Sequence, residues 1–226
     1  MGQDIRKYFL VGMMMVLSSL ACAGSNLVVN GSFDNTNDPL SNWTYKYDTG
    51  NALVASNALH VAVTNDGARP HVLALTADYN ILWVIGQGVM VDSDPIPLQP
   101  GGKYKLTISA RSTGPNCRIL VEGYRWRPGI KPHPHPALSE LRKCYRFNQV
   151  YFGPDKTGNF GNVGPNWDRA SQTFPEDKLS PLAQESYNKI QFLIIHIIAI
   201  NVINSEVAKG GDYSLFVDDV VLEYRK

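Results

Sequence analysis

Residues 98–111 read LQPGGKYKLTISAR, and this stretch decides the class of fold. Its Pro-Gly-Gly sequence at 100–102 supplies residues that adopt the backbone angles of a tight turn. From Lys103 to Ser112 apolar and polar side chains alternate, which is typical of a strand with one buried and one solvated face. The stretch therefore predicts an antiparallel strand that follows a hairpin turn. The apolar positions are Tyr104, Leu106, Ile108 and Ala110.

Outward from this strand, the chain after residue 25 repeats the same pattern. Short alternating segments recur between turn sequences such as 65–67 and 209–212, and no segment has the 3.6-residue period of a long amphipathic helix. Residues 192–203 are apolar on both faces and predict a central strand. Nine strands indicate an all-β sandwich in a single domain, residues 24–226. The predicted strands are residues 26–30, 43–47, 58–64, 71–76, 81–91, 103–112, 118–127, 189–203 and 213–224.

Residues 128–175 interrupt the strand pattern with many Pro, Gly and Asn residues. So long a stretch without regular structure is uncommon in a compact domain and is usually functional or disordered. Its aromatic side chains argue against disorder, and residues 137–145 look helical, with Ser139 as the cap. We expect a long irregular insertion that contains at most a short helix. Cys144 should hold it over one end or face of the sandwich.

The first residues have the order of a bacterial secretory signal peptide. Arg6 and Lys7 precede an apolar stretch, residues 8–20, that is too short to span a bilayer, and small residues follow it. The sequence predicts a signal peptide over residues 1–23 and a protein that is secreted, periplasmic or held at the cell surface. Lipidation at Cys22 is the alternative, and only then would the protein be attached to a membrane.

Cys117 and Cys144 remain when the leader is removed. Export to an oxidising compartment favours a disulfide between them. Such a bond would close a loop of roughly 28 residues and stabilise the fold by about 3–4 kcal/mol. Two buried free thiols are the alternative.

Three segments together resemble a known family. Residues 26–34 (NLVVNGSFD), followed by Asn42-Trp43-Thr44, resemble the opening of bacterial CenC-type carbohydrate-binding modules of the galactose-binding-like jelly-roll group. Residues 215–222 (LFVDDVVL) resemble the closing strand of these modules, and residues 98–111 resemble their central strand. The resemblance implies a jelly-roll β-sandwich of two antiparallel sheets. It also implies a non-catalytic module that binds a polysaccharide or glycoconjugate on its concave sheet.

The same resemblance implies a structural calcium ion between the first and last strands. The matching carboxylates are Asp34 and Asp218, and backbone carbonyls near Asn30 and Ser32 would supply further oxygen ligands. The alternative is that Asp34 caps a turn while Asp218 pairs with a neighbouring base.

A sugar site needs aromatic faces for stacking and planar polar groups for paired hydroxyls. In residues 118–127 strand parity places Glu122, Tyr124 and Trp126 on one face. The alternative is that Trp83 and Trp126 pack beneath the insertion, while Trp43 belongs to the core. We predict that the following side chains line the concave sheet and bind carbohydrate: Trp83, Gln87, Arg111, Glu122, Tyr124 and Trp126.

Other classes of function have less support in the sequence. The formal net charge of +1 gives no strong field toward nucleic acid, so a neutral partner is expected. No nucleophile elbow, zinc-protease helix or phosphate-binding glycine loop occurs, and we expect no enzyme activity. The carboxylates of a polysaccharide lyase or hydrolase would be Glu122 with Asp92 or Asp94.

Two histidine positions have simpler explanations than metal binding or catalysis. His133 and His135 alternate with prolines that favour an extended, solvated segment, and His196 is expected to be a satisfied core histidine. The main alternative to glycan binding is a structural or adhesive module that binds a protein. Its partner would be a separately encoded enzyme or surface protein.

Overall fold

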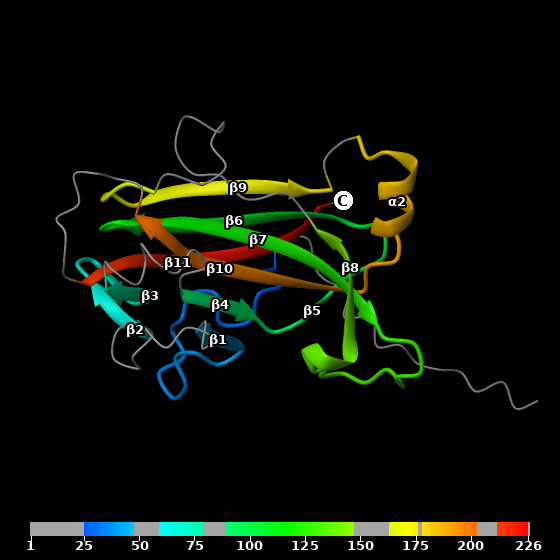
Figure 1. Cartoon of the computed structure of the whole chain (residues 1–226), viewed down its shortest axis with the longest axis horizontal. Helices are drawn as coiled ribbons and strands as arrows, with labels where there is room; N and C mark the ends of the chain where they lie inside the picture. The colour runs from blue at the N-terminus through cyan, green and yellow to red at the C-terminus, as the bar shows by residue number, and fades with distance from the viewer. Residues whose placement is uncertain are drawn as a thin grey trace, which may run out of the picture.

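The computed structural model describes residues 25–47, 59–78, 89–146, 163–175, 178–202 and 212–225, which form two packed antiparallel sheets (Figure 1). Sheet A has the order β1 (Trp43–Tyr47), β4 (Val89–Ser93), β10 (Phe192–Val202), β7 (Pro115–Trp126) and β8 (Leu141–Arg146), and β5 (Ile96–Pro97) also pairs with β10. Sheet B has the order β2 (Leu59–Asp66), β3 (Arg69–Asp78), β11 (Asp212–Arg225), β6 (Lys103–Ser112) and β9 (Asp168–Phe174). The predicted jelly-roll sandwich of two antiparallel sheets is confirmed.

The core lies between the sheets and is filled by the alternating side chains of their strands. In β6 the predicted apolar set, Tyr104 to Ala110 at every second position, is at most 1% exposed. Strand β10 contributes Leu193 and Ile195 to the same core, while Ile194 on its other face is 1% exposed. Since β10 is buried on both faces, it is the central strand that its continuous apolar sequence predicts.

The two ends of the described chain meet beside the end of β11. The Leu27 N–H donates to the Leu222 carbonyl at 2.8 Å, and the Val220 N–H donates to the Gly31 carbonyl at 2.9 Å. A Cβ at Gly31 would lie 2.1 Å from the Val220 carbonyl oxygen, so only glycine fits there. Residues 26–30 are therefore docked on β11, but the predicted strand is wrong, because separate bonds replace a continuous ladder.

The insertion supplies an edge strand to each sheet, which the sequence analysis did not expect. Strand β8 pairs with β7 in sheet A, and β9 pairs with β6 in sheet B. The predicted helix over residues 137–145 is reduced to a single 3-10 turn, η1 (Leu138–Glu140), because pairing with β7 overrides the local helix propensity of β8. Residues 147–162 lie outside the described part of the chain.

One short α-helix, α2 (Pro181–Tyr187), closes the end of the sandwich at which β8 and the C-terminus lie (Figure 1). The Ser180 side chain caps it by accepting from the Ala183 N–H, and Pro181 occupies its first turn. Its last residue, Tyr187, is 2% exposed and donates to the Gly102 carbonyl. Among the described residues no helix has the length and apolarity that crossing a membrane requires.

The predicted disulfide between Cys117 and Cys144 is wrong, and both thiols are free. Cys117 lies in the core on β7, whereas the Cys144 thiol lies 3.5 Å from the Gly123 carbonyl. Six residues along a strand correspond to about 20 Å, and a disulfide requires Cα atoms within about 7 Å. Burial raises the pKa of both thiols. The signal peptide and Cys22 lie outside the described residues.

Candidate functional site

The outer face of sheet A carries three of the predicted site residues. Strand β7 places Glu122, Tyr124 and Trp126 on this face, as strand parity predicts, while its alternate residues face the core. Their environments differ, because Glu122 and Tyr124 are at most 8% exposed and Trp126 is half-buried.

Glu122 is part of a buried polar network that crosses four strands. Its carboxylate accepts from the Tyr124 hydroxyl at 2.8 Å and from Lys143 Nζ of β8 at 3.1 Å. On β10, His196 Nδ1 lies 2.6 Å from Asp92 Oδ1 of β4, and His196 Nε2 lies 3.4 Å from Glu122 Oε2. An imidazole thus lies between two carboxylates.

Opposite charges outweigh desolvation in this network. Burial works to raise the pKa of Glu122, but interactions with His196, Tyr124 and Lys143 lower it to about 2. Burial likewise works to lower the pKa of His196, but Asp92 and Glu122 outweigh it and the pKa is raised. Both shifts favour the charged forms. His196 is therefore a buried, carboxylate-paired histidine. The expectation of a satisfied core histidine is met only in part, because His196 lies on the outer face of sheet A and its Nε2 makes no hydrogen bond within the described residues.

Trp126 belongs to an aromatic group next to this network. Its ring meets the Phe192 ring edge-on at a centroid distance of 5.5 Å, and the His133 ring lies 5.0 Å away. A small apolar cluster that includes Tyr124 and Phe192 supports these rings. Trp126 therefore packs partly under the insertion, through His133, and keeps part of its surface exposed.

Arg111 does not share this surface, so its predicted place beside Glu122 is wrong. It lies on β6 in sheet B, where its guanidinium forms a bidentate pair with Asp66 and lies 4.2 Å from the centre of the Phe216 ring. The consecutive strands β6 and β7 belong to different sheets, which the alternation pattern does not reveal. Trp83 and Gln87 lie outside the described residues, and their part in a site stays a prediction.

The two carboxylates assigned to calcium have partners on sheet B. Asp34 Oδ1 lies 3.0 Å from His71 Nδ1, and Asp218 Oδ2 accepts from Arg69 at 2.8 Å. Arg69 also contacts Asp219 at 3.0 Å, so it already supplies the positive charge that calcium would bring. Within the described ranges, no group of three or more His, Cys, Asp or Glu side chains is arranged to hold a metal ion. Calcium at this position stays a prediction.

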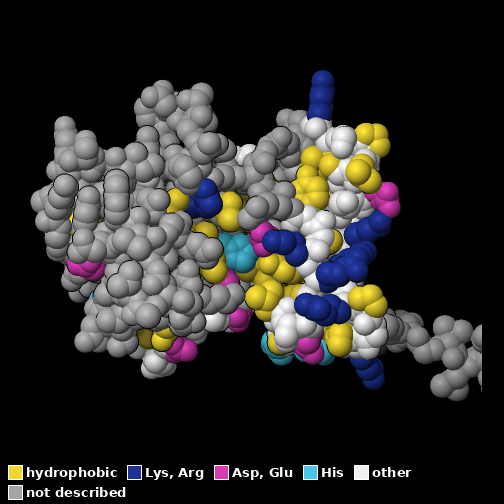
Figure 2. Space-filling model, in the orientation of Figure 1, with side chains coloured by type: hydrophobic (Ala, Val, Ile, Leu, Met, Phe, Trp, Pro, Cys, Tyr) yellow, Lys and Arg dark blue, Asp and Glu magenta, His cyan; other side chains and the backbone are white. Residues whose placement is uncertain are grey.

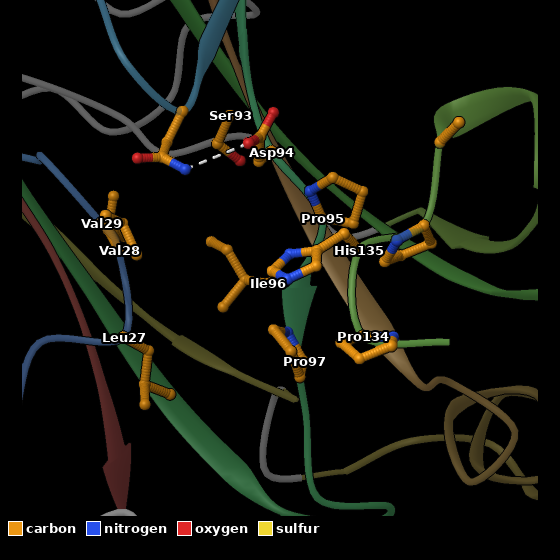
Figure 3. Close-up of a pocket in the computed structure, with 13 residues that line it drawn as sticks. Leu27, Val28, Val29, Ser93, Asp94, Pro95, Ile96, Pro97, Pro134 and His135 are labelled. Carbon is orange, nitrogen blue, oxygen red and sulfur yellow. Dashed lines mark hydrogen bonds between the residues drawn. The ribbon is translucent and has the colours of Figure 1, made fainter. Parts of the chain in front are cut away.

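A pocket of about 440 Å³ lies beside the aromatic group. Three segments line it: residues 27–29 near the start of the described chain, residues 93–97 around β5, and residues 134–137 of the insertion. Figure 3 shows residues 27–29 on one side and Pro134 and His135 on the other, with Ile96 and Pro97 between them. Because His133 packs against Trp126 and the next residues line the pocket, the two features are neighbours.

The pocket combines apolar walls with a few polar groups. The Asn42 side-chain amide donates to Asp94 Oδ2 at 3.2 Å, both side chains are exposed, and His135 adds an imidazole. A paired amide and carboxylate can bond to neighbouring hydroxyl groups, while the apolar walls accept C–H surface. The volume is within the range of about 300–1,000 Å³ that small-molecule sites occupy.

Glu140 holds the insertion over this pocket. Its carboxylate lies 3.0 Å from His133 Nε2 and accepts from the Ala137 N–H at 2.8 Å. Sequence reasoning considered Asp94 as a catalytic carboxylate and His135 as a metal ligand, but it missed the pocket. Nothing local signals the site, because its three segments are far apart in the sequence and meet only in the folded chain.

Comparison of the sequence with protein-family models and with curated proteins found no match. Among solved structures, the fold is similar to the CBM22-1 xylan-binding domain of Paenibacillus barcinonensis Xyn10C, with a TM-score of 0.47, 12% identity, and coverage of 91% of this chain and 98% of that one. The N-terminal cellulose-binding domain of Cellulomonas fimi β-1,4-glucanase C gives a TM-score of 0.44, 14% identity, and coverage of 88% and 97%.

A third similar structure is the enzymatically active domain of bacteriophage CBA120 tailspike protein 4, with a TM-score of 0.45 and 14% identity. The match covers 88% of this chain but only 21% of the tailspike chain. Similarities at this level assign neither a ligand nor an activity to this chain.

Proposed function

We propose that this chain is an exported, non-catalytic module that binds a glycan. The pocket of Figure 3 receives a sugar unit, and the exposed part of Trp126 stacks against the adjoining part of the glycan. The observation that carries the proposal is the exposed Asn42–Asp94 pair at the edge of an apolar pocket. A sugar presents the matching chemistry, with paired hydroxyls at its edge and C–H groups on its face.

The buried network supports binding over hydrolysis. A glycosidase needs one carboxyl group that stays protonated near neutral pH to act as the acid. Glu122 has a pKa lowered to about 2, so it is ionised, and both of its oxygens are bonded to neighbouring side chains. Asp92 is bonded to His196 in the same way. The network therefore has the features of a structural element of sheet A.

Binding to a panel of neutral and acidic polysaccharides, measured by affinity electrophoresis and calorimetry, tests this function. Asp94→Ala removes an exposed carboxylate whose described partner is Asn42, so the fold should persist while the affinity falls about tenfold or more. Asp168→Ala, which removes an exposed carboxylate on β9 of sheet B, is the matched control and should bind like the parent.

Two results would contradict the proposal. If the Asp94→Ala variant retained the parent affinity, the pocket would not be the sugar site. If the protein bound no polysaccharide of the panel but captured a protein partner, the adhesive alternative would be correct.

A further inference from the structure

Positive charge is concentrated in one segment of a chain that is almost neutral overall. Residues 125–146 contain six Lys and Arg side chains and one acidic side chain, Glu140, which gives this segment a formal charge of +5 against +1 for the whole chain. The structure folds the segment into the end of β7 and into β8, and Figure 2 shows basic side chains gathered over this end of sheet A.

Two arginines lie directly opposite each other in this ladder. Arg125 of β7 and Arg142 of β8 are Cα partners, so their side chains leave the ribbon on the same face about 5 Å apart at Cβ. Like charges in such a position are destabilising. The repulsion is reduced here because the pair lies at an edge of the sheet, where both side chains reach solvent.

Three more cations surround this pair. Arg127 is exposed and donates through Nε to the Leu141 carbonyl, which leaves its outer nitrogens accessible. Lys143 and Lys189 have side chains that are 51% and 47% exposed. Burial raises the pKa of Cys144, and the charges of Arg125 and Lys189 oppose this rise, so both cations lie near that thiol. We call Arg125, Arg127, Arg142, Lys143 and Lys189 the basic strip.

The arginines of the strip differ from Arg69 and Arg111 of sheet B in their partners. On sheet B, Arg69 pairs with Asp218, and Arg111 pairs with Asp66. For the three arginines of the strip, no carboxylate of the described ranges lies within ion-pair distance. Within the described part of the chain, their charge therefore has no acidic counterpart.

We propose that the basic strip binds the acid groups of an anionic glycan, either uronate carboxylates or sulfates. This inference rests on the proposed glycan-binding function and names its class of ligand. Guanidinium groups bind carboxylate and sulfate oxygens in pairs, and two facing arginines provide two such forks. Arg127 directly follows Trp126, the last residue of β7, and donates to the Leu141 carbonyl, so acid groups of a glycan that stacks on Trp126 meet the strip at the edge of sheet A. There Arg125 and Arg142 leave the ladder on the face opposite to Trp126.

From this local charge we expect an anionic partner, whereas the net charge of the whole chain suggested a neutral one. A short basic strip next to a sugar-sized pocket fits an acidic saccharide better than a nucleic acid or a membrane, because both of these need an extended positive surface. On sheet B, Arg69, Arg111 and Arg225 are paired with acids.

The experiment compares polygalacturonate and heparin with carboxyl-reduced polygalacturonate, which has the same backbone without charge. The full chain should bind at least one of the acidic polymers about tenfold more tightly than the neutral one, with affinity that decreases as salt increases. The double variant Arg125→Gln/Arg142→Gln should lose this preference. Its melting temperature should not fall, because a repulsive pair is removed.

The matched control is Lys105→Gln/Arg169→Gln, which removes the same charge from the outer face of sheet B and should bind like the parent. Equal affinity for the neutral and acidic polymers, with loss on Asp94→Ala, would overturn this inference and leave the glycan-binding function intact. Equal losses in both double variants would overturn it as well. So would equally tight binding of DNA or phosphatidylglycerol vesicles, which would indicate unspecific attraction to polyanions.

Discussion

Replacing Glu122 by Gln tests whether the buried network of sheet A stabilises the fold through its charges. The lowering of the Glu122 pKa from 4.5 to about 2 corresponds to a stabilisation of the folded state on the order of 3 kcal/mol, at about 1.4 kcal/mol per pH unit. The side chain is 7% exposed, so solvent screens this interaction little. We expect the Glu122→Gln variant to lose about 3 kcal/mol of unfolding free energy at pH 7.

The pH dependence of the stability difference shows whether the charge of Glu122 or the shape of its side chain is responsible for the loss. A carboxyl group whose pKa is lowered in the folded state contributes its full stability above its unfolded pKa of 4.5, and this contribution disappears as the pH falls toward 2. The difference between parent and variant should therefore be full at pH 7 and 5, smaller at pH 3, and close to zero near pH 2. Urea unfolding followed by tryptophan fluorescence measures it.

The matched control for this experiment is Glu223→Gln. Glu223 is bonded to Arg225 at 2.8 Å, but its side chain is 28% exposed, so its loss should cost less than about 1 kcal/mol. A Glu122→Gln variant that loses under 1 kcal/mol at pH 7 would refute the reasoning. An equal loss of stability at pH 3 and pH 7 would also refute it, because a change in packing alone does not depend on pH.

Two further predictions concern the core. Gly31→Ala places a methyl group against the Val220 carbonyl and should lower the unfolding free energy by at least about 2 kcal/mol, whereas Gly164→Ala, with no atom within 4 Å of the added Cβ, should leave the melting temperature unchanged. In the absence of reductant, iodoacetamide should modify Cys144 before the buried Cys117, and complete modification of both thiols should require unfolding. A protein mass that showed both cysteines unmodified and joined in a disulfide after unfolding would contradict the free thiols.

Much of the fold could be predicted because apolar and polar side chains alternate within the individual strands of the sandwich. Residues 43–47 and 103–112 are strands with the predicted bounds, and β10 and β11 differ from prediction by one to three residues at each end. The insertion could not be predicted in this way. Its strands β8 and β9 are stabilised by pairing with β7 and β6, partners that lie outside their own sequences.

Only the part of the site that lies on a single strand could be predicted from the sequence. Parity correctly places Glu122, Tyr124 and Trp126 on one face, but it cannot tell which sheet a strand joins, and so Arg111 was assigned to the wrong surface. The pocket depends on contacts between three distant segments. Four of the five residues of the basic strip were visible in the composition of residues 125–146, but averaging charge over the whole chain concealed them.

The insertion also determines how the molecule ends on one side. Since β8 and β9 are the outermost strands of the two sheets, they cover the hydrogen-bonding rims of β7 and β6. Deleting residues 128–175 would expose the edges of β7 and β6 together, and these unpaired edges could form hydrogen bonds with strands of another chain. In β8 the adjacent charges of Arg142 and Lys143 hinder such pairing in the intact protein. The insertion therefore protects the sheet edges against aggregation and also covers the pocket.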